Sequence, residues 1–245
     1  MKYSQLVPKT RRDDPKDAPS PGTRLLIRGG FIDQLAGGIW IMTPLGLMVR
    51  RLIEEIVRQE MERAGAIELE LPLLQPKEYW DETDRWQKYL AASIAFHLTD
   101  RKGAEFILAP TAEEVVTHFA RRNLRSYRDL PTNLWQMGPK FRDEFRPRQG
   151  IIRGREFLMK DAYSFDATEE GMRRSYREME SAYDRIFRRS GFHFIKVEAD
   201  SGAIGGSGSA EFMAITEYGE DTLLYCPDCF SQALKEPVQG NLVRS

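Results

Sequence analysis

The sequence has few of the residues that build disulfide frameworks and metal centres. It contains two cysteines and three histidines in 245 residues. Cys226 and Cys229 form a lone Cys-x-x-Cys pair, which is half of a tetrahedral zinc site, and no second Cys or His pair follows it. We therefore expect neither a disulfide scaffold nor a metal site, and a reducing cytoplasm is the expected location.

Long apolar runs are missing as well. No stretch reaches the roughly 18 to 20 consecutive apolar residues of a membrane span, and the start of the chain lacks the apolar core of a secretory signal. The 36 Lys and Arg residues nearly balance the 37 Asp and Glu residues, so the composition does not indicate a nucleic-acid binder. Clusters such as Arg121–Arg128 suit either RNA phosphates or a solvated helix face. A Gly-x-x-x-x-Gly-Lys segment is absent, so a nucleotide has to be held in another way.

Helical and strand periodicities alternate along the chain. Apolar spacing predicts long helices over 44–64 and 168–190, and a shorter helix over 111–123. The expected strands are 67–71, 106–108, 133–141, 156–165, 194–197, 212–216 and 223–225. Strands in hairpins, mixed with long helices, predict an α+β fold: an antiparallel β-sheet flanked by helices.

Composition also suggests where the domains divide. Residues 1–23 are rich in Pro, Asp, Lys and Arg and read as an arm, 24–222 as the core, and 223–245 as a tail or the start of an insertion. A short amphipathic stretch covers 25–35, and a polar patch carries Trp80 and Trp86.

The segment between strands 133–141 and 156–165 is rich in Arg and Gly. Arg142 and Glu144 are two residues apart, so on a strand both point to one face. That face then offers a bidentate cation and a carboxylate acceptor, which suits a ligand with phosphates and an exocyclic amine, such as ATP. Phe157 on the returning strand offers an aromatic face to a purine. The alternative is a basic surface hairpin with a structural Arg–Glu pair and a core Phe.

A second constellation lies at the expected start of helix 111–123. Thr111 and Glu113 flank one residue there, and a hydroxyl and a carboxylate can jointly accept hydrogen bonds from a ligand ammonium group. The alternative is a capping box made by Thr111 and Glu114. A third segment, 202–212, is rich in Gly and Ser and by itself reads as a flexible turn before a strand.

Together these segments resemble class II aminoacyl-tRNA synthetases, and the bacterial type of prolyl-tRNA synthetase in particular. Phe141-Arg142-Asp143-Glu144, the Arg-rich loop and the return strand 155–165 are similar to motif 2 of this class. The helix 44–64 and the strand 67–71 resemble motif 1, which in this class builds the homodimer interface. The similarity extends from Ser4 to about Tyr225.

The resemblance implies a role for each candidate residue. Arg142 would bind the α-phosphate and serve as the catalytic residue, Glu144 would accept from the adenine amine, Phe157 would stack on adenine, and Arg153 would reach the outer phosphates. The residues implied in amino-acid binding are Thr111, Glu113, Arg142, Met159, Asp161, Tyr163, Ser209 and Phe212. Without the resemblance, the alternation of Met159, Asp161 and Tyr163 fits core positions equally well.

The implied activity is ATP-dependent activation of proline, with Mg²⁺, and transfer to the acceptor end of tRNA(Pro). Ala112 and Ala210 stand where the family has histidines, so altered substrate contacts are expected. Motif 3, the editing insertion and the anticodon-binding domain have no match, which indicates a fragment of a longer enzyme or a natural short paralogue. We expect weak activity from the chain alone. Two alternatives stay open: activation of an amino acid for a carrier other than tRNA, and a non-catalytic dimerisation or regulatory module.

Overall fold

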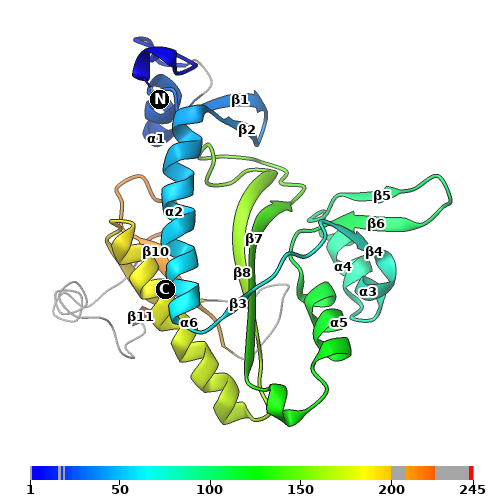
Figure 1. Cartoon of the computed structure of the whole chain (residues 1–245). Coiled ribbons are helices and arrows are strands. Elements are labelled where there is room, and N and C mark those ends of the chain that lie inside the picture. Colours follow the sequence, from blue (N-terminus) through cyan, green and yellow to red (C-terminus); the bar gives the residue numbers. More distant parts are fainter. Residues whose placement is uncertain (1, 16–17, 19, 200–207, 224–242, 245) are drawn as a thin grey trace. The chain divides into compact units, whose positions relative to one another are not determined.

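The computed structural model describes residues 2–15, 18, 20–199, 208–223 and 243–244 (Figure 1). It divides into two compact units, Met1–Met179 and Glu180–Ser245, with the boundary inside the long helix α6 (Glu169–Arg189). The arm, core and tail boundaries at 23 and 222 stay predictions. Of the helices in the described ranges, none combines the length and the apolar character that crossing a membrane requires.

A long antiparallel hairpin forms the centre of the first unit. Its strands, β7 (Thr132–Phe141) and β8 (Glu156–Phe165), pair over their whole length, from Thr132 opposite Phe165 to Phe141 opposite Glu156. The short strand β3 (Ile67–Glu68) joins β7 in parallel. The predicted α+β class and both hairpin strands are confirmed, and the expected strand 67–71 is present in a shorter form.

The N-terminal part of the first unit folds into a short 3₁₀ helix, two α-helices and a small hairpin. The short 3₁₀ helix η1 (Tyr3–Gln5) and α1 (Pro21–Arg28) precede β1 (Ile32–Ala36) and β2 (Ile39–Met42), so the amphipathic stretch 25–35 is divided between α1 and β1. The predicted long helix is confirmed as α2 (Pro44–Arg63), and its N-cap is the Thr43 side chain. Gly46 packs against the preceding hairpin so closely that a Cβ there would lie 1.9 Å from the Phe31 carbonyl oxygen.

A small sheet and short helices follow α2. The sheet has the strand order β4–β6–β5, with β4 (Leu74–Pro76), β5 (His97–Thr99) and β6 (Glu105–Leu108). The helices α3 (Lys77–Asp81) and α4 (Arg85–Ala91) bury Trp80 and Trp86 against Tyr89 and Ile107. The expected polar patch is therefore wrong, because the tryptophans form an apolar core that the surrounding charged residues hide in the sequence. The remaining elements before β7 are α5 (Glu113–Asn123) and η2 (Tyr127–Asp129).

The second unit holds a small sheet of its own. Strand β9 (Phe194–Glu198) pairs in antiparallel with β10 (Ala210–Ala214) and in parallel with β11 (Val243–Arg244). The expected strand 212–216 thus begins two residues earlier. Leu223 is not in a strand, and the rest of the expected strand 223–225 lies outside the described residues. Within this unit Phe212 contacts the rings of Tyr183, Phe187 and Phe194.

Candidate functional site

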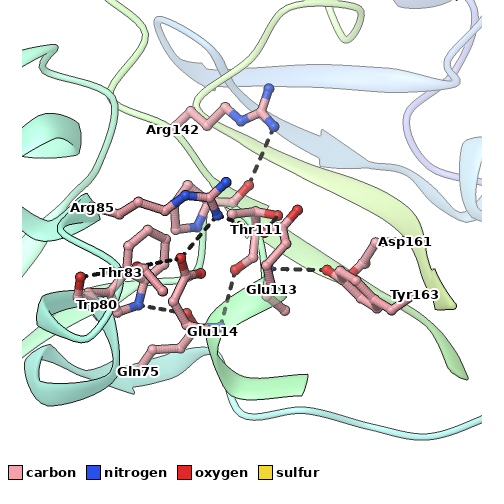
Figure 2. Close-up of polar contacts among 12 residues, drawn as sticks. Gln75, Trp80, Thr83, Arg85, Thr111, Glu113, Glu114, Arg142, Asp161 and Tyr163 are labelled. Carbon is pink, nitrogen blue, oxygen red and sulfur yellow. Dashed lines mark hydrogen bonds and ion pairs between the residues drawn. The ribbon is translucent and has the colours of Figure 1, made fainter. Parts of the chain in front are cut away.

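Arg142 lies just beyond the end of β7 and reaches back toward the start of α5. The Arg142 amide still pairs with the Arg155 carbonyl at 2.9 Å, but the Glu144 amide donates to the Arg142 carbonyl at 2.7 Å. This tight turn means that Arg142 and Glu144 do not alternate on a strand, so that part of the prediction is wrong. The Arg142 guanidinium lies 5.4 Å from the centre of the Phe157 ring. It also donates to the Pro110 carbonyl at 3.4 Å (Figure 2).

Glu144 is engaged within the arginine-rich loop. Its carboxylate accepts from Arg153 Nε at 2.8 Å, and its backbone carbonyl accepts from Arg155 Nε at 3.1 Å. The hydrogen bond from Arg153 lowers the pKa of the Glu144 carboxyl below its ordinary value. Since half of the Arg153 side chain remains exposed, this ion pair sits at the surface and can exchange partners with a ligand.

The segment Thr111–Glu113 leads into α5 without a capping box. The N-cap residue is Ala112, no side chain caps the helix, and the Thr111 hydroxyl instead donates to the Glu113 carboxylate. Glu114, the other half of the expected box, is buried and accepts from Arg85 at 3.0 Å and from Thr83 at 3.1 Å. The capping interpretation is therefore wrong, because Glu114 is bound by residues that lie far away in the sequence.

A buried polar network runs under this segment from the central hairpin. Tyr163 donates to Asp161 at 2.5 Å and accepts from the Ala112 amide at 3.2 Å. The Asp161 carboxylate also accepts from Gln136 at 2.8 Å and pairs with Lys140 at 2.9 Å. Burial, together with the hydrogen bond to Asp161, raises the pKa of the Tyr163 hydroxyl, so it stays protonated as a donor.

A second buried contact reaches the same segment from the small sheet. Gln75 is fully buried and donates to the Thr111 carbonyl at 3.2 Å, while its own oxygen accepts from the Trp80 indole at 3.0 Å (Figure 2). Arg85 completes this side, 3.8 Å from the Glu113 carboxylate. Burial alone would lower the pKa of Arg85, but the hydrogen bond and charge of Glu114 outweigh it and the pKa is raised.

A pocket of about 120 Å³ lies beside this charged pair, on the α5 side. Its lining residues are Tyr79, Glu82, Thr83, Arg85, Glu113, Glu114, Thr117, His118 and Arg121. Glu113 therefore lines the pocket and also accepts from the Thr111 hydroxyl.

Sequence reasoning missed several residues of the site, and only some of them carried a usable signal. Gln136 lies directly opposite Asp161 in the β7–β8 register, so aligning the two predicted strands is enough to find that pair. Lys140 follows on the same face of β7 by strand alternation. Gln75 and Arg85 offer no local signal, because each acts on a segment about thirty residues away in sequence.

The structure brings most of the predicted residues of the first unit into contact, and two of the predicted residues belong to the second unit. The contacts described above link Thr111, Glu113, Arg142, Phe157, Asp161 and Tyr163. Met159 lies on the same face of β8 as Asp161 and Tyr163. Glu144 and Arg153 bind each other. Ser209 and Phe212 belong to the second unit, where Phe212 lies in the aromatic cluster.

Two further predictions concern parts of the chain outside the described residues. Residues 202–207 of the Gly/Ser segment and the pair Cys226 and Cys229 fall there. In the described ranges, no group of three or more His, Cys, Asp or Glu residues is placed to hold a metal ion.

Comparison with protein families and known sequences gives a consistent result. Residues 96–235 match the model of the tRNA synthetase class II core domain (G, H, P, S and T). A proline–tRNA ligase of Geobacter metallireducens is 50% identical over 245 residues, all of this chain and 43% of the relative. The ligase of Cupriavidus taiwanensis is 53% identical over 227 residues, 93% of this chain and 39% of the relative. The chain thus spans about two fifths of the length of the curated relatives it matches.

Solved structures with a similar fold include two synthetases from eukaryotic microbes. Prolyl-tRNA synthetase from Cryptosporidium parvum, in complex with L-proline and AMP, aligns with a TM-score of 0.66 at 17% identity, over 77% of this chain and 39% of that one. The Giardia lamblia enzyme, in complex with prolyl-adenylate, gives 0.63 at 22% identity, over 69% of this chain and 35% of that one. At these identities the comparison establishes the fold.

Proposed function

Because this chain belongs to the class II tRNA synthetase core-domain family, we propose that it carries the site at which a proline–tRNA ligase activates proline with ATP. The relatives at about half identity are named as such ligases. In this proposal the substrates are proline and ATP, the product is prolyl-adenylate, and the prolyl group then passes to the acceptor end of tRNA(Pro). The reaction takes place in the cytoplasm.

The position of Arg142 is the observation that carries the proposal. Its guanidinium lies 5.4 Å from the centre of the Phe157 ring and donates to the carbonyl of Pro110, the residue before Thr111. In the proposed complex a phosphate bound by Arg142 has the purine stacked on the aromatic ring, and the ammonium group bound by the carboxylate of Glu113 and the hydroxyl of Thr111. A phosphate between a purine and an amine is the arrangement found in an aminoacyl-adenylate.

The chemistry requires positioning and charge neutralisation. The proline carboxylate attacks the α-phosphorus of ATP, a new carboxyl–phosphate bond forms, and the bond to pyrophosphate breaks. The attacking carboxylate is already ionised at neutral pH, so no general base is needed. Arg142 neutralises charge on the α-phosphate, Arg153 extends to the outer phosphates, and Glu144 accepts from the adenine amine. Glu113 and Thr111 hold the proline ammonium, with Met159, Asp161 and Tyr163 around the amino acid.

The residues present fit the triphosphate better than they fit a free metal ion. Arg142 and Arg153 are donors suited to phosphate oxygens. Mg²⁺ in nucleotide sites is commonly held by the phosphates with one or two carboxylates, and it would supply further charge neutralisation here.

The exposed face of α2 supports a homodimer as the assembled form. Met48, Val49, Leu52 and Ile53 are 42–68% exposed although they are apolar, and Ile67 on β3 is 58% exposed. A helix with such an uncovered apolar stripe is typical of an interaction surface. We propose that a second copy of the chain covers it.

Exchange of labelled pyrophosphate into ATP, driven by proline, tests the proposed function. We expect proline to support exchange or, if the chain alone turns over too slowly, a non-hydrolysable prolyl-adenylate analogue to bind in calorimetry. Arg142→Ala should abolish exchange, or weaken analogue binding by roughly a hundredfold. Arg122→Ala, on the exposed side of α5, should change neither signal. Stronger exchange with another amino acid would overturn the choice of proline, and absence of both exchange and analogue binding would overturn the function.

A further inference from the structure

We propose that the Thr111–Ala112 peptide group is a positioning element of the site, fixed by Gln75 on its carbonyl and by Tyr163 on its amide. This peptide group lies in the backbone between Thr111 and Glu113, the two residues that would hold the substrate ammonium. The expected effect on substrate binding rests on the proposed function, whereas the restraint on the peptide plane does not depend on any ligand.

The two contacts bind opposite ends of one planar unit. Gln75 Nε2 donates to the Thr111 carbonyl oxygen at 3.2 Å, and the Ala112 amide donates to the Tyr163 hydroxyl at 3.2 Å. In a trans peptide the C=O and N–H bonds point in opposite directions. A rotation of the plane therefore has to break both hydrogen bonds at once, and each contact restrains the group held by the other.

Each contact is itself anchored in the interior. Gln75 and Trp80 have no exposed surface, and the Trp80 indole fixes the orientation of the Gln75 amide by donating to its oxygen. The Tyr163 hydroxyl is oriented by Asp161, which Gln136 and Lys140 hold in turn. Buried polar groups that are hydrogen-bonded in this way are costly to rearrange, so neither contact can move freely.

The restraint matters because the orientation of the Thr111–Ala112 peptide plane sets the directions of the neighbouring Thr111 and Glu113 side chains. Ala112 is fully buried, so the chain cannot compensate by shifting sideways. Turning the Thr111–Ala112 plane changes the directions of the Thr111 hydroxyl and of Glu113, which lie one residue to either side. Small errors in the placement of such groups have large effects on binding and rate. Gln75 and Tyr163 are therefore positioning residues for the ammonium-binding pair.

Amide exchange at Ala112, followed by NMR, tests the inference directly. Tyr163→Phe removes the acceptor of the Ala112 amide, and Gln75→Leu removes the donor on the opposite side of the plane, together with the acceptor of the Trp80 indole. We expect each variant to speed exchange at Ala112 by about tenfold, in line with the loss of one hydrogen bond. Tyr127→Phe and Gln34→Leu are matched exposed controls and should leave that rate unchanged. An unchanged rate at Ala112 in Gln75→Leu would overturn the proposal.

Ligand binding gives a second readout that a general loosening of the fold would not reproduce. We expect the dissociation constant of the prolyl-adenylate analogue to rise about tenfold in each variant, while ATP binds within about twofold of the parent chain. The double variant should lose less than the product of the single effects, because either loss already frees the plane. Equal losses for ATP and the analogue would contradict a positioning role.

The two proposals can fail separately. If the parent chain binds no analogue, the proposed function fails, and the exchange rate at Ala112 still decides the structural claim. If Gln75→Leu does not fold, Gln75→Glu keeps the oxygen that faces Trp80 and donates to Thr111 only when protonated. Exchange at Ala112 is then compared with the parent chain at the same pH, which removes the intrinsic pH dependence of amide exchange. The variant should exchange faster than the parent at high pH and approach the parent rate as the pH falls, and a rate at parent level throughout would overturn the proposal.

Discussion

The two sides of the candidate site are built in different ways. On one side, the segment Thr111–Glu113 rests on buried polar contacts, including the Lys140–Asp161 pair, whose side chains are 1% and 9% exposed. On the other, the loop that follows β7 is held by surface contacts, and its Arg153–Glu144 pair is 50% and 20% exposed. The loop also exposes Phe145 and Ile152 by more than four fifths.

This difference indicates that the two sides of the site have different functions. A buried network of hydrogen bonds and an ion pair restricts the geometry of the site, which suits discrimination of a small amino acid by a few contacts. Exposed ion pairs exchange partners at low free-energy cost, which suits a loop that has to admit a triphosphate and release pyrophosphate. The measurements below test whether the contrast between the two sides holds.

The largest effect is expected from breaking the buried ion pair. Asp161→Ala leaves the Lys140 ammonium buried without its partner and should lower the free energy of unfolding by about 3–5 kcal/mol. Urea denaturation measures this loss. Glu144→Ala, the matched change on the exposed side, should cost about 1 kcal/mol or less. Similar losses of unfolding free energy in the two variants would contradict the difference between the buried and the exposed side of the site.

A large effect on binding, with little effect on stability, is expected at Arg142. Arg142→Ala should weaken binding of the prolyl-adenylate analogue by roughly a hundredfold, since a charged donor to the phosphate is lost. The affinity of Arg142→Lys for the analogue should lie between those of the parent chain and Arg142→Ala, because lysine keeps the charge and lacks the planar guanidinium. Calorimetric titration measures both variants, and a lysine variant as weak as the alanine variant would argue that geometry alone matters.

A pH-dependent effect is expected at Lys160, which follows Met159 on β8. Burial lowers the pKa of Lys160 from 10.5 to about 8. The unfolded chain then binds more protons than the folded chain between these values, so the free energy of unfolding should rise with pH from about 8 to 10.5.

Lys160→Met should abolish this component. The parent chain minus the variant should show a slope of at most about 1.4 kcal/mol per pH unit in that window. Thermal unfolding of both proteins at several pH values measures it. A flat difference would mean that the Lys160 ammonium is as well solvated or paired in the folded chain as in the unfolded chain.

The smallest effect is expected at Arg153. Arg153→Ala should change the free energy of unfolding by less than about 1 kcal/mol, because its pair with Glu144 is exposed. The pKa of the Glu144 carboxyl should rise toward its ordinary value, since Arg153 is the main cause of its lowering. An NMR titration of the Glu144 side chain follows this change, and an unaltered pKa would show that the loop holds Glu144 by other contacts.

The sequence by itself determined the regular elements and the chemistry of single segments. The apolar spacing of 44–64 and 168–190 led to α2 and α6, and the paired strands β7 and β8 were expected nearly to the residue. These features are local, since a period of a few residues decides which face is buried. The residue types at Arg142 and Phe157 were enough to suggest a nucleotide.

Only the tertiary structure decided how these segments hold one another. It placed Trp80 and Trp86 in a core, turned the chain between Arg142 and Glu144, and bound the Thr111–Ala112 peptide from both sides. Gln75 and Tyr163 are 36 and 51 residues away from the backbone groups they bind. Hydrogen bonds across such separations depend on the path of the whole chain, and no local pattern encodes that path.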